Sequence, residues 1–90
     1  MAKVRIKAKL VVPDAPLKFG DRNLNVIYLQ QCLQKIYKCK PSIVGEDNGH
    51  YGALTETTVR HFQADHGLHI DGRYTDLTRR VLREVIKCLK

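Results

Sequence analysis

Two turns in this sequence gather residue types that could recognise a ligand by hydrogen bonds, a positive charge and aromatic surface. Residues 48–55 (NGHYGALT) return in similar form as residues 71–78 (DGRYTDLT), and such an internal repeat indicates the unit from which a fold is built. Arginine can hold a carboxylate through two parallel hydrogen bonds, while amide and carboxylate side chains can bond a polar ligand or their own turn. The candidate residues in and beside the turns are Asn48, Tyr51, Gln63, Asp71, Arg73 and Tyr74.

Several of these residues also have a structural interpretation. Asn-Gly and Asp-Gly dipeptides accept positive φ easily, so both phrases are expected to form tight turns. Gln30 and Gln63 each follow an apolar helical residue. A glutamine in that position usually hydrogen-bonds the backbone of a neighbouring turn, and we favour this role over ligand contact. A tyrosine in such a turn either fills the core or lines a shallow groove, and both alternatives stay open for Tyr51 and Tyr74.

Residues for catalysis or metal binding do not stand at recognisable spacings. His61 and His66 are five residues apart, whereas a zinc pair on one helix face needs a spacing of four, and no cysteine stands at ligand spacing to them. No familiar nucleophile–base motif is present, and a small bundle encloses little volume in which a carboxyl pKa could be raised. Three cysteines without a Cys-x-x-Cys motif argue against a disulfide framework. We therefore expect no enzyme, no metal and no cofactor.

Length and composition predict a single small domain. The chain has 90 residues, of which 43% are hydrophobic and 28% charged, as in ordinary soluble globules. No apolar stretch approaches the ~20 residues of a membrane span, so no membrane partner is expected. A net charge of +7 favours anionic partners, although it could serve solubility alone. The N-terminus lacks the apolar segment of a secretory signal, which predicts synthesis in the cytoplasm.

Helical spacing of apolar residues predicts three helices, over about 25–36, 56–66 and 79–89. Thr55 and Thr78 are placed to cap the second and third helices, and Gly67 with Leu68 to end the second. The predicted core consists of Val26, Leu29, Leu33, Val59, Phe62, Leu82, Val85 and Ile86.

The N-terminal segment follows a different pattern. Residues 3–10 alternate between basic and apolar side chains, which predicts a strand. Such a strand packs on the helices, pairs with another strand, or adds to the sheet of a protein partner. Pro13 and Pro16 then interrupt regular structure. Residues 1–16 are accordingly interpreted as an extended basic arm with a linker, and residues 17–90 as the helical domain.

From Leu17 to Ile86 the chain resembles the peptidoglycan-binding domain found beside many bacterial and phage cell-wall hydrolases. The resemblance is carried by FGD at 19–21, VIYLQ at 26–30, NGHYG at 48–52 with Thr55, FQ at 62–63, GL at 67–68, and DGRY at 71–74 with Thr78. The sequence departs from the family pattern at Asn48 and Thr75, where aspartate and glycine are usual, and in a longer first loop over 38–47.

The resemblance implies a mainly α fold, a compact three-helix bundle with the basic arm added. It further implies non-catalytic binding of cell-wall peptidoglycan by a stand-alone module, through the stem peptide, in a groove between the helices and the two turns. In that groove Tyr51 and Tyr74 would supply apolar contact and Arg73 would bind a peptide carboxylate. Asn48, Asp71 and Gln63 would hydrogen-bond the ligand or hold the turns.

Two other functions stay open. One is a structural or adaptor subunit, for example of a phage or injection particle, that uses the same fold for protein contacts through residues such as 3–10. The other is nucleic-acid binding, which is disfavoured because the connection over 67–79 is far longer than the 3–4-residue turn of a helix-turn-helix motif. The protein is expected to act at the cell wall or within a phage-like particle.

Overall fold

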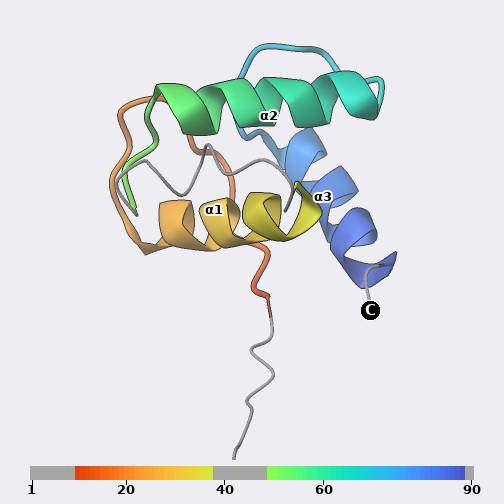
Figure 1. Ribbon diagram of the computed structural model, residues 1–90, viewed down its shortest axis with the longest axis horizontal. Helices are drawn as coiled ribbons and strands as arrows, with labels where there is room; N and C mark the ends of the chain where they lie inside the picture. Colours follow the sequence, from red (N-terminus) through yellow and green to blue (C-terminus); the bar gives the residue numbers. More distant parts are fainter. Residues whose placement is uncertain (1–9, 38–48, 89–90) are drawn as a thin grey trace, which may run out of the picture.

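A computed structural model describes residues 10–37 and 49–88, and it shows three helices of equal length (Figure 1). The helices are α1 (Leu24–Ile36), α2 (Ala53–Asp65) and α3 (Asp76–Cys88). In Figure 1, α1 and α2 lie side by side, and α3 runs steeply past one end of the pair. The described residues contain no β-strand, only two isolated antiparallel bridges. The predicted mainly α, three-helix fold is therefore confirmed. No described helix has the length and apolar character needed to cross a membrane.

The first helix begins close to its predicted start. Asn23 is its N-cap, in an extended conformation, and its side-chain oxygen accepts a hydrogen bond from the Val26 amide (3.2 Å). Asparagine is among the residues best suited to this position because it satisfies one of the free amides of the first turn.

The second and third helices begin three residues earlier than predicted. They start at Ala53 and Asp76, so Thr55 and Thr78 lie inside the first turns and are not caps. Both threonine side chains are buried and bond to glutamines, which is why the expected capping geometry is absent. The real cap of α3 is Thr75, whose hydroxyl accepts from the amide of residue 78 (3.3 Å). The corresponding N-cap of α2 is a glycine, residue 52, without a side-chain bond.

The C-terminus of α2 has the predicted form. Gly67 has φ of 69°, the amide of Gly67 bonds the Ala64 carbonyl, and the Leu68 amide bonds the Gln63 carbonyl at 2.8 Å. This pair of backbone bonds defines a Schellman motif, which turns the chain sharply away from the helix. Leu68 is partly buried against the core, as expected for the apolar partner of that motif.

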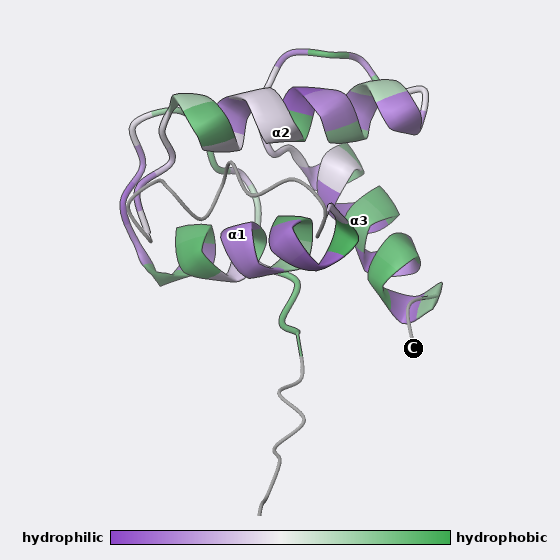
Figure 2. Cartoon of the chain, viewed as in Figure 1, coloured by the Kyte–Doolittle hydropathy of each residue, from purple (hydrophilic) through white to green (hydrophobic). Residues whose placement is uncertain are grey.

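One core occupies the space between the helices. Six of the eight predicted core residues are buried, while Val85 and Ile86 are only partly buried at its edge. Figure 2 shows apolar and polar positions alternating along each helix, as expected when one face packs inward. Four buried residues were not in the predicted core: Leu17, Cys32, Tyr51 and Tyr74.

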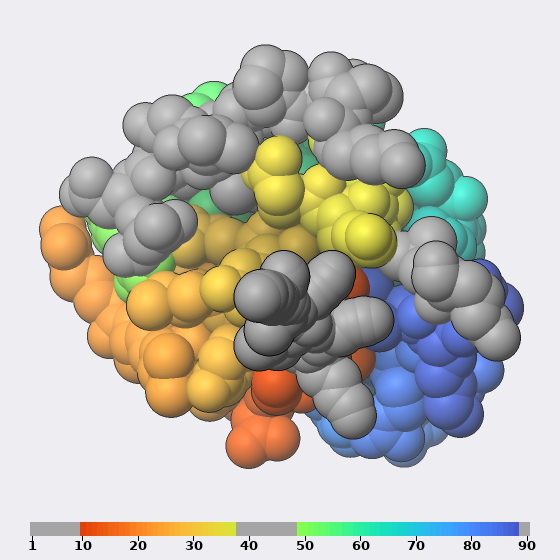
Figure 3. Space-filling model, turned by 60° about the horizontal axis from the view of Figure 1, so that its bottom comes forward, coloured from red at the N-terminus to blue at the C-terminus, as the bar shows by residue number. Residues whose placement is uncertain are grey.

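Residues 10–17 belong to the packed domain. Pro13 is buried, its carbonyl accepts from the Tyr74 hydroxyl (2.8 Å), and the Cys32 thiol donates to the Val11 carbonyl (3.4 Å). In Figure 3 this segment lies between the surfaces of α1 and α3. Of the predicted basic strand, residues 3–9 lie outside the described residues, and Leu10 packs against the core.

Phe62→Ala tests this core assignment. Phe62 is 1% exposed, and emptying a buried aromatic site costs about 3–5 kcal/mol in unfolding free energy. The matched control is Phe19→Ala, because Phe19 is 56% exposed and its loss is expected to change stability by less than ~0.5 kcal/mol. Urea melts of both variants give the comparison. Equal losses for the two variants would show that the core is misassigned.

Candidate functional site

Both repeated turns contain a glycine with positive φ. Gly49 and Gly72 have φ angles of 89° and 74°, in the left-handed region that glycine adopts without strain. The sequence prediction of positive φ at both glycines is confirmed. Each turn leads directly into a helix, the first into α2 and the second into α3.

The first turn is held by Gln30 from α1. The Oε1 atom of Gln30 accepts from the Gly49 amide (2.8 Å), and its Nε2 donates to the His50 carbonyl and to the Thr55 hydroxyl, both at 3.0 Å. The glutamine is 3% exposed. One side chain therefore ties a helix, a turn and the first residues of the next helix together.

The second turn is held by Gln63 from α2 in the same manner. Its Oε1 accepts from the amides of Asp71 (3.0 Å) and Gly72 (2.9 Å). Its Nε2 donates to the Arg73 carbonyl (2.9 Å), to the Asp71 carboxylate (3.0 Å) and to the Thr78 hydroxyl (3.2 Å). The glutamine is 1% exposed, so the predicted role of holding a turn is confirmed for both glutamines.

Tyr51 and Tyr74 are fully buried. Each is 0% exposed, and burial raises the pKa of both hydroxyls. The Tyr51 hydroxyl donates to the Gly72 carbonyl (2.6 Å), which joins the two turns, and the Tyr74 hydroxyl donates to Pro13. With no exposed surface these rings fill the core, and they offer no apolar contact to a ligand in this conformation.

A short segment, residues 17–22, contacts both turns. Leu17 pairs with Tyr74 through two backbone hydrogen bonds of 2.9 and 3.0 Å. A few residues later, the Gly20 amide donates to the Tyr51 carbonyl and the Tyr51 amide donates to the Asp21 carbonyl, both at 2.9 Å. Residues 17–22 thus connect the second turn to the first through backbone hydrogen bonds. The sequence marked this segment by the FGD motif at 19–21, but it did not show which residues the segment pairs with.

Asp71 and Arg73 are the candidate residues that reach the surface within the described residues. Asp71 is half-buried, and its Oδ1 accepts from the Arg73 amide (2.9 Å) and from Gln63. Partial burial raises the pKa of the Asp71 carboxyl, but these two hydrogen bonds and nearby positive charge together outweigh it and hold the pKa below its ordinary value. Arg73 is exposed beside this anchored carboxylate. The remaining candidate, Asn48, lies outside the described residues.

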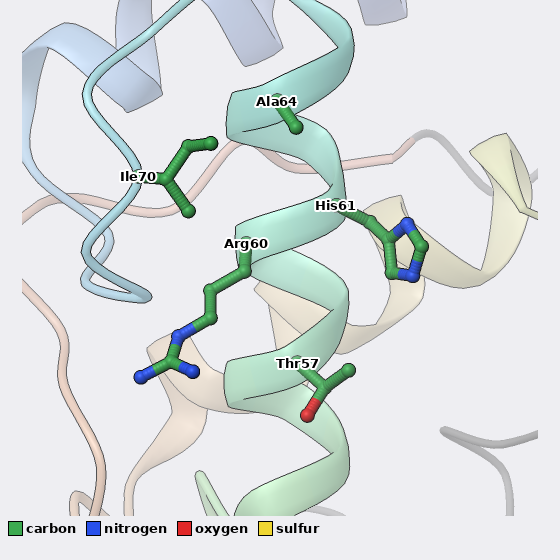
Figure 4. Close-up of a pocket in the computed structure, with 5 residues that line it drawn as sticks. All are labelled: Thr57, Arg60, His61, Ala64 and Ile70. Carbon is green, nitrogen blue, oxygen red and sulfur yellow. The ribbon is translucent and has the colours of Figure 1, made fainter.

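A shallow groove that the sequence did not predict lies beside the second turn (Figure 4). Its volume is about 270 Å³, and it is lined by Thr57, Arg60, His61 and Ala64 of α2 and by Ile70 of the following loop. In Figure 4, Arg60 and Ile70 lie on one side of the helix, and Thr57 and His61 on the other. The groove combines an apolar floor with a cation at its edge.

Over residues 10–37 and 49–88, no three histidine, cysteine, aspartate or glutamate side chains come together as a metal site would need.

Arg79 and Arg80 lie near the N-terminus of α3, where a positive charge opposes the helix dipole. Asp76, in the first turn of α3, pairs with Arg79 at 2.9 Å and with Arg80 at 3.2 Å, and these ion pairs account for both arginines.

Comparison with known proteins identifies the domain. Residues 22–82, well over half of the chain, match the family model for a putative peptidoglycan binding domain. The chain belongs to this family. Both glutamine-held turns and all three helix starts fall within the matched region.

Two solved structures are similar to this peptidoglycan-binding domain. The crystal structure of the SleB N-terminal domain has a TM-score of 0.70 and 26% identity, covering 80% of this chain and 93% of that one. A Burkholderia AP3 phage endolysin has a TM-score of 0.61 and 34% identity over 76% of this chain. The match covers only 24% of the endolysin, so the present chain corresponds to about a quarter of it. No curated protein matches the chain.

Gln63→Ala tests the hydrogen-bonding role of this glutamine. The substitution leaves the buried Gly72 amide and the neighbouring Asp71 amide without their acceptor, at about 1–3 kcal/mol for each unsatisfied group. We expect a loss of roughly 2–4 kcal/mol in urea melts and faster hydrogen exchange at the Gly72 amide. Gln31→Ala, at an exposed position of α1, is the control and is expected to stay near wild type. A loss below ~1 kcal/mol for Gln63→Ala would contradict the assignment.

Proposed function

We propose that this chain is a stand-alone, non-catalytic module that binds bacterial peptidoglycan through its stem peptide. The observation that carries the proposal is the family match over residues 22–82, which spans both turns. The binding surface is formed by the exposed side of the turns, together with residues 17–22 that connect them.

The chemistry of this surface suits an anionic peptide. Arg73 is exposed on a turn whose backbone is fixed by Gln63. Ligand binding therefore requires little further ordering of the Arg73 backbone. A guanidinium bonds a carboxylate with two parallel hydrogen bonds, and the net charge of +7 attracts such a ligand from a distance. In this proposal Gln63 and Asp71 hold the turn and Asn48 bonds the ligand from the first turn. Tyr51 and Tyr74 act from inside the core.

The ionisation of two carboxyl groups, Asp71 and Asp76, suits hydrogen-bond acceptors better than general acids. A general acid for cleaving a glycosidic bond needs a carboxyl group whose pKa is raised toward neutrality. Asp71 instead has a lowered pKa, and the hydrogen bond from Arg79 lowers the pKa of Asp76. Both side chains are therefore charged near neutral pH and serve as hydrogen-bond acceptors.

Sedimentation with purified cell-wall sacculi tests the proposal. Arg73→Ala is expected to weaken binding about five- to hundredfold, since a partly exposed charged hydrogen bond is worth roughly 1–3 kcal/mol. Arg83→Ala, which removes an exposed arginine of α3, is the control for net charge and should bind as wild type does.

The wild-type result decides between function classes. Retention on sacculi through moderate salt supports wall binding, whereas phosphate contacts would be lost steeply between about 50 and 200 mM salt. Wild-type protein that stays in the supernatant at low salt and micromolar concentration would overturn the proposal and favour the adaptor function.

We also propose that residues 3–10 offer a contact for a protein partner, on the basis of their alternating basic and apolar side chains. Deleting residues 1–9 preserves the segment 10–17 that packs on the core. We expect this deletion to leave the melting temperature unchanged and to abolish co-purification with the partner. A lower melting temperature would instead show that the segment docks on its own domain.

A further inference from the structure

We propose that the groove on α2 binds the carboxylate end of a wall peptide that terminates in a small apolar residue. The groove is the one lined by Thr57, Arg60, His61, Ala64 and Ile70. This inference rests on the proposed function, because it assigns one end of the stem peptide to a defined place. It adds a second cation, Arg60, to the surface on which Arg73 lies.

The volume of the groove indicates how much of a ligand it can hold. Pockets that enclose whole small molecules usually measure about 300–1,000 Å³, and this groove measures about 270 Å³. It also lies open along the outside of α2, where Figure 4 shows Arg60 and Ile70 on one side of the helix and His61 on the other. A hollow of this shape receives one or two residues of a longer chain, with the rest of that chain running across the surface.

The apolar part of the groove is supplied by Ala64 and Ile70. Ile70 is 53% exposed, so a ligand methyl group placed against it would remove apolar surface from water. Ala64 contributes a single methyl group, so the apolar patch that it forms with Ile70 is small. Both features favour a small side chain such as that of alanine over a large aromatic one.

Arg60 supplies the charge, and the second turn restricts its position. A Cβ atom placed on Gly72 would lie 2.8 Å from Cγ of Glu56 and 3.0 Å from Nε of Arg60, so the turn backbone packs directly on these two side chains. The ion pair between Arg60 and Glu56 is 3.9 Å long, which is beyond hydrogen-bond distance. The guanidinium is therefore held beside the turn with donor capacity for a carboxylate.

The groove is coupled to the turn through Gln63. That glutamine bonds the Gly72 amide, and the backbone of Gly72 leaves no room for a Cβ atom beside the Arg60 side chain. Arg73 follows Gly72 in the sequence and is exposed. A peptide crossing the turn can thus meet Arg73 and end at Arg60, which gives one continuous path for a ligand with more than one carboxylate.

Nuclear magnetic resonance titration of the full chain tests the assignment. The probe is a synthetic stem pentapeptide that ends in two alanines with a free carboxylate, compared with the same peptide as a C-terminal amide. We expect amide shifts at residues 57–64 and 70 with the acid, and binding at least fivefold weaker for the amide, by the ~1.4 kcal/mol per decade relation. Shifts confined to other residues, or equal binding of acid and amide, would overturn the inference.

Variants separate charge from shape. Arg60→Ala is expected to weaken binding of the acid about five- to hundredfold and to abolish the difference between acid and amide, while Arg60→Lys restores part of it. Ile70→Ser should weaken both peptides alike. Arg83→Ala is the charge control, and unchanged urea melts confirm that each variant is folded.

Parallel sedimentation with sacculi keeps the two proposals distinct. If wild-type protein fails to bind sacculi, the proposed function is overturned. If it binds sacculi and Arg60→Ala binds them and the free acid equally well, only the groove assignment is overturned.

Discussion

The hydrogen bonds of Gln63 are the constraint on which the rest of the domain depends. The described residues contain no β-sheet, so the buried backbone groups of the second turn need partners from elsewhere. A single amide side chain supplies several of them: its Oε1 accepts from two backbone amides, and the two hydrogens of its Nε2 are shared among three acceptors within hydrogen-bond distance. A buried polar network of this kind stabilises a structure only when every member is satisfied. The positions of α3, the turn and the surface beside it all follow from that condition.

A glutamine bonds a turn glycine in both copies of the repeat, but the number of residues between the two differs. Gln30 bonds a glycine 19 residues further on, whereas Gln63 bonds one only 9 residues further on. The extra ten residues fall between the helix and the turn, so they lengthen the connection without altering the hydrogen-bonded unit. Loops are tolerant of such insertions, because closure entropy grows slowly with loop length. The repeated unit is therefore a glutamine, a glycine turn and a buried threonine, joined in space and only loosely constrained in sequence.

Local sequence predicted the features that depend on local chemistry. The positive φ of Gly72 and the Schellman ending at Gly67 follow from glycine itself. The helix starts were three residues late because Thr55 and Thr78 looked like caps, yet their hydroxyls bond glutamines far away in the sequence. Only the three-dimensional structure shows that each threonine hydroxyl bonds a distant glutamine instead of capping its helix.

The features that sequence missed are those made by distant segments. Pairing of residues 17–22 with both turns has no periodic signature, and the burial of Tyr51 depends on a carbonyl 21 residues away. The groove on α2 needs Ile70 from a loop and the close approach of Gly72. The spacing of apolar residues in a sequence predicts a helix face, but no such spacing predicts a hollow between a helix and a loop.

The two copies of the repeat also separate folding from recognition. The tyrosine and the threonine that both copies share are buried, and they carry the hydrogen bonds that hold the unit together. The residue between the shared glycine and tyrosine differs, and it is half-buried His50 in one copy and exposed Arg73 in the other. The shared tyrosine and threonine therefore hold both copies of the unit together. In the proposed function the ligand is bound by Arg73, at the position where the two copies differ.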